Sequence, residues 1–256
     1  MFDIFFACAP KDFNKLPFVI DAAVRNIKGY DNICVCAPKE IPPRTLDKIK
    51  VDYKIVYDKD VLPIERKGWG YRPNWLFQQH LKLFQRVTSE WYLTLDCDTI
   101  INRPMTFFEG EKPVYWKGQD QFYGPYFIFQ ALMIGLPKVS DHTFIADMNL
   151  IHRPIIDEML EKNGYTIESF IAKSQQITDK HCHLGEPELY GSYCCKYYPD
   201  MYVERFLKQK SEGGRVQKTE DALLWNDSET VYRIKEIKKL DYDTWAFHSW
   251  LVEGGH

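Results

Sequence analysis

The sequence lacks a long apolar run and an excess of basic residues, and each absence excludes a class of protein. No stretch approaches the roughly 18–20 apolar residues that a membrane-spanning helix needs, so we expect no transmembrane segment. The net charge is -3 and no basic stripe is present, which argues against nucleic acid as a partner. The apolar first nine residues have no basic leader, so they predict a strand and not a signal peptide.

A regular cysteine pattern is also missing. The seven cysteines are odd in number and irregularly spaced, which indicates reduced thiols in a cytoplasmic protein; we leave open that it lies at a membrane surface. Cys34 and Cys36 are separated by one residue, so they form no CxxC motif. Cys182 lies between His181 and His183, where a polar loop is a simpler interpretation than a metal cluster.

Hydrophobic periodicity predicts strands alternating with helices. Strands are expected at 2–9, 32–37, 53–57 and 91–95, and helices at 13–27, 45–49 and 76–84. Strand, helix and strand within the first forty residues indicate a right-handed βα unit. Further along, the apolar run 130–135 predicts a central strand, and 194–210 is expected to continue as a helix. The pattern as a whole predicts an α/β fold.

The chain is organised around the segment 91–101, where an apolar strand ends in Asp96 and Asp98. Residues i and i+2 of an extended chain point the same way, so both carboxylates can converge on one hard cation. Two ionised groups at the tip of a buried strand need a cationic partner. In open α/β sheets the carboxyl end of a strand is where ligands bind. A turn with two solvated aspartates is the alternative.

Leu95-Asp96-Cys97-Asp98 resembles the DxD motif of GT-A glycosyltransferases, which hold a divalent metal and the diphosphate of a sugar nucleotide. The resemblance implies a Rossmann-like single domain over 1–256, with a central mixed, mainly parallel sheet flanked by helices. Residues 1–102 would form a nucleotide-binding half that ends in the DxD motif. Residues 103–256 would form an acceptor half with a metal-ligating segment near the carboxyl terminus.

The helix before this motif carries a second resemblance. Trp75, Gln78, Gln79 and Lys82 are similar to residues of bacterial and viral GT-A-like transferases. Gln78 and Lys82 share one helix face, and the resemblance implies that Lys82 points toward the diphosphate; a solvated surface lysine is the alternative. The resemblance also implies donor contacts from Ala9, Asp12, Arg72, Asp96, Asp147 and Asn149. For Asp12 a helix N-cap is an equally simple interpretation.

Two acids at a predicted helix start, Glu186 and Glu188, form the next candidate group. Pro187 suits the first turn of a helix, and the helix dipole favours acids there, so both can serve the helix alone. By resemblance to inverting GT-A enzymes, Glu186 is the first choice and Glu188 the second for a base that activates the acceptor hydroxyl. The sequence departs from that family at Pro187, where many members have a second acid.

His248, among aromatic residues near the carboxyl end, resembles the GT-A histidine that completes the metal shell. Together with Asp96 and Asp98 it would hold Mn²⁺ or Mg²⁺, and an imidazole ligand favours Mn²⁺. A core histidine satisfied by its neighbours is the alternative.

These residues predict a metal-dependent glycosyltransferase that moves a sugar from a UDP- or GDP-linked donor to a hydroxyl of a glycan or lipid-linked acceptor, with inversion. The family resemblance suggests polysaccharide biosynthesis as its setting. One rival is a metal-dependent nucleotidyltransferase or phosphohydrolase, but Ala9-Pro10-Lys11 is not the glycine-rich phosphate loop such enzymes usually have. The other rival is a non-catalytic carbohydrate-binding protein that uses aromatic segments such as 119–130.

Overall fold

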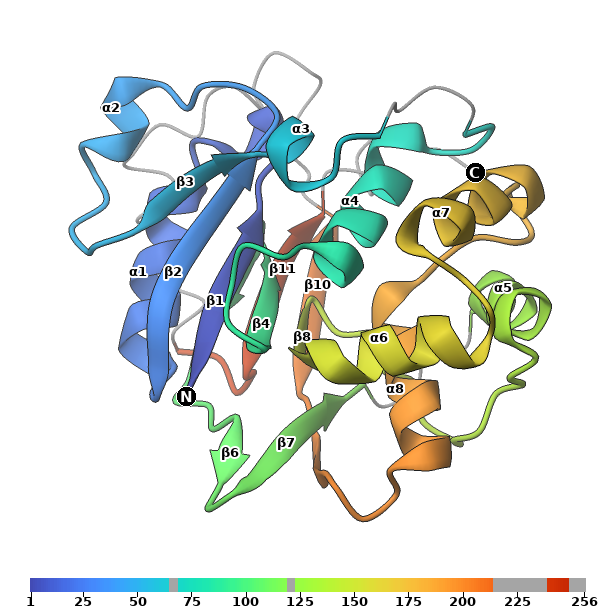
Figure 1. Ribbon diagram of the computed structural model, residues 1–256. Helices are drawn as coiled ribbons and strands as arrows, with labels where there is room; N and C mark the ends of the chain where they lie inside the picture. Colours follow the sequence, from blue (N-terminus) through green and yellow to red (C-terminus); the bar gives the residue numbers. More distant parts are fainter. Residues whose placement is uncertain (65–68, 119–122, 214–238, 249–256) are drawn as a thin grey trace.

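The computed structural model describes residues 1–64, 69–118, 123–213 and 239–248, with backbone alone for 210–213 and 247–248. At its centre is a five-stranded sheet in the order β3-β2-β1-β4-β8 (Figure 1). Four of its strands are parallel and β8 pairs antiparallel with β4. The strands are β1 (Phe2–Ala7), β2 (Tyr30–Ala37), β3 (Lys54–Tyr57), β4 (Trp91–Asp96) and β8 (Met148–His152). The predicted α/β fold with a mixed, mainly parallel sheet is confirmed.

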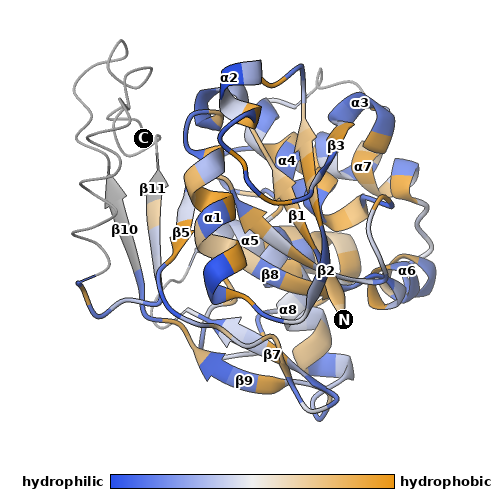
Figure 2. Ribbon diagram, turned by 90° about the vertical axis from the view of Figure 1, so that its left-hand side faces the viewer, coloured by the Kyte–Doolittle hydropathy of each residue, from blue (hydrophilic) through white to orange (hydrophobic). Residues whose placement is uncertain are grey.

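Helices cover both faces of this sheet, which explains why the central strands are continuous apolar runs. All six residues of β1 are buried, and this strand is largely hydrophobic in Figure 2. One face packs against α1 (Leu16–Asn26) through Ile4, Phe6, Leu93 and Leu95. The other face packs against α4 (Pro73–Phe84), α6 (Arg153–Lys162) and α8 (Glu186–Tyr197). The sheet is therefore the middle layer of three.

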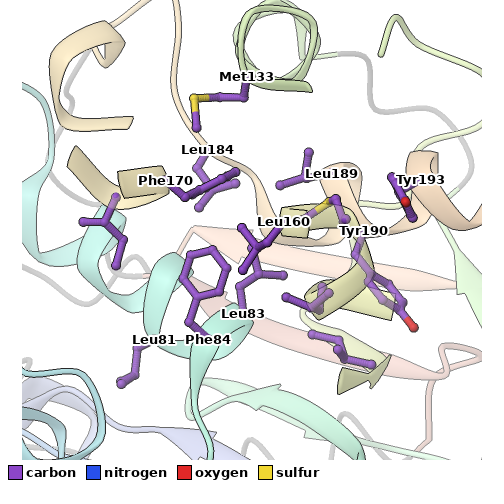
Figure 3. Packing of buried hydrophobic residues seen from close by; sticks show 14 of the residues in the cluster. Leu81, Leu83, Phe84, Met133, Leu160, Phe170, Leu184, Leu189, Tyr190 and Tyr193 are labelled. Carbon is purple, nitrogen blue, oxygen red and sulfur yellow. The ribbon is translucent and has the colours of Figure 1, made fainter. Parts of the chain in front are cut away.

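The hydrophobic core on the α4 side of the sheet joins five helices, and part of it is shown in Figure 3. In addition to α4, α6 and α8, it includes α5 (Gly124–Ile134) and α7 (Ile167–Ile177). Leu81, Leu83 and Phe84 of α4 belong to this cluster together with Phe170 of α7 and Leu189 of α8, and the rings of Phe84 and Phe170 are in edge contact. Side chains of α4 and α8 are thus held in fixed positions relative to each other, which matters for the polar residues between them.

Smaller elements complete the described structure. One three-stranded sheet holds β6 (Phe108–Glu109), β7 (Lys112–Lys117) and β9 (Val203–Phe206), and another holds β10 (Gln209–Gly213), β11 (Thr244–His248) and β5 (Thr99–Ile101). The short helices are η1 (Pro10–Asp12), α2 (Pro43–Leu46) and α3 (Asp58–Val61). Among the described residues, no helix has the length and apolar character needed to span a bilayer.

Two sequence-based predictions are wrong. The apolar run 130–135 is the end of helix α5, which has Pro125 in its first turn and ends at Gly135, a glycine with φ of 65°. A short apolar run fits a buried helix as well as a strand, and those two residues mark the helix. The helix expected over 194–210 stops at Tyr197, two residues before Pro199, and the chain continues as β9 and β10.

Candidate active site

Three charged side chains from distant parts of the chain meet at the carboxyl end of β4. Asp96 is the last residue of that strand, Lys82 lies in the last turn of α4, and Glu186 is the first residue of α8. The Lys82 ammonium forms an ion pair with Asp96 Oδ1 and lies 3.3 Å from Glu186 Oε1. The sequence predicted each of these residues for the site, and the structure brings all three together.

The packing of α4 and α8 determines this meeting point. Lys82 lies between the core residues Leu81 and Leu83 in sequence, and the hydroxyl of Tyr92 on β4 donates to the carbonyl of Lys82 at 3.0 Å. At the start of α8, the Tyr115 hydroxyl donates to the carbonyl of Pro187 at 3.2 Å. These contacts fix the backbones from which the charged side chains project.

Burial makes the electrostatics of the group strong. Lys82 is 3% exposed, so the solvated surface lysine considered as an alternative does not apply. Burial by itself lowers the pKa of Lys82, but Asp96 and Glu186 together outweigh it and the pKa is raised. Lys82 therefore stays cationic between two carboxyl groups.

Glu186 has the properties of a general base. Burial raises its pKa to about 7, Lys82 acts against this rise, and the charge of Asp96 adds to it. Its backbone N–H donates to Gln79 Oε1 at 3.2 Å, while its own Oε2 is buried without a hydrogen-bond partner in the described part of the chain. A carboxylate with a free oxygen and a pKa near neutrality can accept a proton at physiological pH.

Glu188, the second choice for the base, is occupied by structural contacts. Its Oε2 accepts hydrogen bonds from the Thr143 hydroxyl at 3.1 Å and from the Phe144 backbone N–H at 3.0 Å. Its Oε1 accepts one from the Lys138 ammonium at 3.4 Å. Both oxygens are thus engaged in holding the segment 138–144 against α8.

The residues predicted to contact the donor near β1 lie at the same edge of the sheet. Asp12 is buried in η1 and forms an ion pair with Lys15 at 2.9 Å. It caps no helix with its side chain, since α1 begins after Lys15 without a side-chain cap. Burial raises the pKa of Asp12, and the nearby charge of Asp98 contributes to the rise. The carbonyl of Ala9 accepts from the Asp12 N–H at 2.9 Å, which shapes the turn.

Gln78 lies against the end of β1, whereas Arg72 lies at the start of α4 beside Trp75. The side-chain amide of Gln78 donates to the carbonyl of Ala7 at 2.8 Å, so it fastens α4 to the end of β1. Arg72 precedes α4 in the left-handed region, with φ of 43°, and its guanidinium lies 4.6 Å from the Trp75 ring centroid. Its φ is unusual for a residue with a side chain.

Asp147 and Asn149 lie beside the strand that ends in Asp96. The Asp96 N–H donates to the carbonyl of Asp147 at 2.9 Å, and the Asp147 carboxylate accepts a hydrogen bond from Gln209. Asn149 is opposite Thr94 in the β4–β8 pairing. It is buried, and neither end of its side-chain amide has a hydrogen-bond partner among the residues the structure describes. Such an amide is suited to a ligand.

The predicted metal ligands are only partly described. Asp98 lies in the turn after β4, and β11 pairs antiparallel with β5, with Ala246 opposite Thr99. That register carries the backbone of His248 toward the Asp98 turn, while its side chain lies outside the described atoms. Within the described residues, no three metal-ligating side chains form a cluster. Asp96 and Asp98 nevertheless offer the hard carboxylate oxygens that Mg²⁺ and Mn²⁺ accept.

Two further residues lie next to Glu186. Gln79, which the sequence analysis grouped with Trp75, Gln78 and Lys82 without giving it a role, accepts a hydrogen bond from the Glu186 N–H. The other, Tyr126, was not among the predicted site residues. Tyr126 packs on Gly185, where an added Cβ would lie 2.6 Å from the ring. No sequence signal connects positions 126 and 185, because the contact is made by the packing of α5 on α8.

Several solved structures are similar to this chain. The match to mouse xyloside xylosyltransferase 1, apo form, extends over 97% of this chain and 99% of the xylosyltransferase chain, at 10% identity and a TM-score of 0.46. The glycosyltransferase GlyE of Streptococcus pneumoniae covers 97% of this chain, at 11% identity and a TM-score of 0.43. The bifunctional glycosyltransferase WbbM covers 96%, at 10% identity and a TM-score of 0.49.

This chain spans 54% of the GlyE chain and 45% of the WbbM chain. No protein-family model and no curated protein sequence matches it. Likenesses of this degree assign no role to any residue, so a function for this chain has to follow from its own site.

Proposed function

We propose that this chain is a glycosyltransferase that moves a sugar from a nucleoside diphosphate sugar to a hydroxyl group of an acceptor. One observation carries the proposal: the buried Lys82 and Glu186 and the partly exposed Asp96, from three distant segments, form a charged group at the carboxyl end of β4. In an α/β sheet this is the edge where nucleotides and other ligands bind. The DxD residues and a candidate base thus face one site.

Glu186 is the proposed base. Its free Oε2 takes the proton of the acceptor hydroxyl. The acceptor oxygen then forms a bond to the anomeric carbon, while the bond from that carbon to the diphosphate oxygen breaks and the diphosphate leaves with the electron pair. Direct displacement of this kind inverts the configuration at the anomeric carbon. A pKa of about 7 suits the task, because the base is then both available and strong enough at neutral pH.

Lys82 has two roles in this scheme. Its positive charge lies between Asp96 and Glu186, where it compensates the buried carboxyl group of Glu186 and the partly exposed one of Asp96. It also contributes a fixed cation close to the place where negative charge develops on the leaving diphosphate. Asn149, whose buried side-chain amide lacks a partner in the described structure, is the proposed hydrogen-bonding contact to the donor sugar.

A divalent cation fits the carboxylates at this edge. Burial is the main cause of the raised pKa of Asp12, and the negative charge of Asp98 adds to the rise; a cation at this edge would offset that second contribution. Asp96 and Asp98 would hold the ion and His248 would complete its shell; Mn²⁺ or Mg²⁺ suits these ligands. When bound, such an ion supplies positive charge to the diphosphate leaving group.

The two halves of the chain divide the work in this proposal. Residues 1–102 would bind the nucleotide and end in the DxD motif, and 103–256 would supply the base, the acceptor side and the last metal ligand. The acceptor would be a glycan or a lipid-linked glycan of a polysaccharide pathway in the cytoplasm.

Donor hydrolysis tests the proposal without knowledge of the acceptor. The purified chain is incubated with Mn²⁺ and UDP- or GDP-linked sugars, and diphosphate release is measured by chromatography. We expect slow release from at least one donor, because water replaces the absent acceptor. The Asp98→Ala variant should lose the activity, and Asp200→Ala, which removes an exposed aspartate of a distant turn, should keep it.

Two outcomes would count against the proposal. Release that survives Asp98→Ala would indicate a different site or a contaminating enzyme. Binding of sugars with no release from any donor would favour a non-catalytic carbohydrate-binding protein.

A further inference from the structure

His183 is a fully buried histidine with one unsatisfied ring nitrogen. Its Nδ1 lies 3.0 Å from the carbonyl oxygen of Asp179, so Nδ1 carries a proton and donates it. Burial lowers the pKa of His183, which keeps the ring neutral. Nε2 is therefore a lone-pair acceptor, and in the described part of the chain it has no hydrogen-bond partner. A buried acceptor in this state calls for a donor from outside the chain.

Four aromatic side chains surround this histidine, and we call them the aromatic chamber. Their ring centroids lie 5.0 to 5.6 Å from the His183 centroid. They come from the start of α4 and from the start of α5, which approach each other only in the folded chain. The four are Tyr71, Trp75, Tyr123 and Tyr126.

The chamber adjoins the candidate base. Tyr126 packs directly on Gly185, which precedes Glu186, and the charge of Glu186 contributes to the raised pKa of the Tyr126 hydroxyl, after the larger effect of burial. A molecule held in the chamber would thus lie next to the carboxylate that is proposed to take a proton from the acceptor.

The outer part of the chamber is accessible. Tyr123 is 39% exposed, and Tyr71 and Trp75 are half-buried, so these three rings are the part of the chamber that a ligand meets first. Arg72 lies over Trp75 at this rim and has a left-handed backbone conformation. Strained residues of this kind are concentrated at binding sites.

We propose that the aromatic chamber binds the acceptor, that the acceptor is a pyranoside, and that one of its hydroxyl groups donates a hydrogen bond to His183 Nε2. Pyranose rings have apolar C–H faces that pack on aromatic rings and hydroxyl groups that need polar partners, and the chamber offers both. This inference rests on the proposed function and narrows it, because protein side chains and lipid hydroxyl groups do not have such a ring.

The alternative explanation is that these residues form a tightly packed aromatic core that binds no ligand, and it leads to a different expectation for variants at position 183. In such a core, phenylalanine at position 183 would remove the unsatisfied Nε2 together with the hydrogen bond from Nδ1 to Asp179. The stability could change, but the KM for an acceptor would stay that of the parent protein. In the proposed subsite the same change removes the acceptor contact while the fold and the donor site stay intact. The His183→Phe variant therefore separates the two explanations.

The experiment uses p-nitrophenyl glycosides of glucose, galactose, mannose, xylose and N-acetylglucosamine as acceptors, with the donor that the protein hydrolyses. Transfer and donor hydrolysis are followed in the same reactions. We expect at least one glycoside to be extended. His183→Phe should raise its KM at least tenfold, which corresponds to about 1.4 kcal/mol, with donor hydrolysis unchanged. His183→Gln, which keeps an acceptor atom, should restore part of the loss and also serves if the phenylalanine variant fails to fold.

His152→Phe is the matched control, because His152 stacks on Trp91 away from the chamber, and it should leave KM unchanged. The inference is overturned if donor hydrolysis occurs but no pyranoside is extended, or if both variants at position 183 keep the parental KM. Absence of donor hydrolysis in the parent protein would instead refute the proposed function. This hydrolysis is measured in reactions that contain no glycoside, so the two failures can be told apart.

Discussion

At the scale of single residues, the site depends on one buried cation between two acids. The pKa of Lys82 is raised although burial acts to lower this pKa, because two carboxyl groups lie against the Lys82 ammonium. Removing one partner of such a buried group leaves an uncompensated charge, which typically costs about 3–5 kcal/mol. The intact group by itself contributes little net stability, and this favours a role in binding and catalysis.

The activity should depend on the ionisation of Glu186. Its pKa of about 7 lies above the ordinary value of 4.5, and only the deprotonated form can act as a base. We expect kcat for transfer to rise with pH up to about 7 and then level off. Glu186→Gln should lower the rate by about 10²- to 10⁴-fold and abolish this acid limb, as measured by pH profiles of both proteins.

The same shift predicts how stability changes with pH. The folded chain holds the proton of Glu186 more tightly than the unfolded chain, so its contribution to stability is fully present below about pH 4.5 and is lost as the pH rises through about 7. Urea titrations measure this change. Between pH 5 and pH 8 the free energy of unfolding of the parent protein should fall by up to about 3 kcal/mol relative to that of Glu186→Gln. Glu161→Gln, at an exposed position, should run parallel to the parent; an equal pH dependence in Glu186→Gln would contradict the shifted pKa.

At the scale of elements, α8 is placed by close contacts that involve glycine. A Cβ added at Gly191 would lie 2.2 Å from Phe144 Cγ. This ring carbon is bonded to Cβ, so it can move little without a shift of the Phe144 backbone. Gly185 is in a similar situation against Tyr126. Glycine at these two positions lets the start and the middle of α8 pack directly on Tyr126 and Phe144.

A pair of glycine substitutions tests this packing. Gly191→Ala should lower the free energy of unfolding by about 1–3 kcal/mol, because the core has no space for the methyl group. Gly124→Ala is the control: it is also helical, has nothing within 4 Å of the added Cβ, and should be neutral or slightly stabilising. Urea unfolding of the two variants measures the difference. Equal stability of both would show that α8 adjusts its position.

At the scale of the whole molecule, the sheet collects residues from both halves of the chain at one edge. Asp12 and Asp96 come from the parallel strands and loops of the first half, while Asp147 and Glu186 come from the second. A ligand that bridges these segments stabilises only the native arrangement, so binding and unfolding are linked.

Nucleoside diphosphates should therefore raise the melting temperature in the presence of Mn²⁺. At a concentration of 100 times Kd, one bound ligand adds about 2.7 kcal/mol, which corresponds to roughly 5–10 °C for a chain of this size. A thermal-shift series with UDP, GDP, CDP and ADP also identifies which nucleobase the protein prefers. EDTA should remove the effect if the cation joins the diphosphate to Asp96 and Asp98. A shift that EDTA leaves unchanged would contradict the metal site.

The sequence by itself determined the α/β fold and the strand that ends in Asp96, because periodicity and chain punctuation are local signals. Lys82 and Glu186 were predicted as site residues from a family resemblance, and the structure places both beside Asp96. The sequence failed for 130–135, where a short apolar run fits either a strand or a buried helix. Only the tertiary structure decided that Glu186 has a free buried oxygen while Glu188 is fully bonded, since the two differ in their surroundings and not in their type. The surroundings of His183 were decided in the same way, because packing brings together rings from α4 and α5 that no spacing in the chain connects.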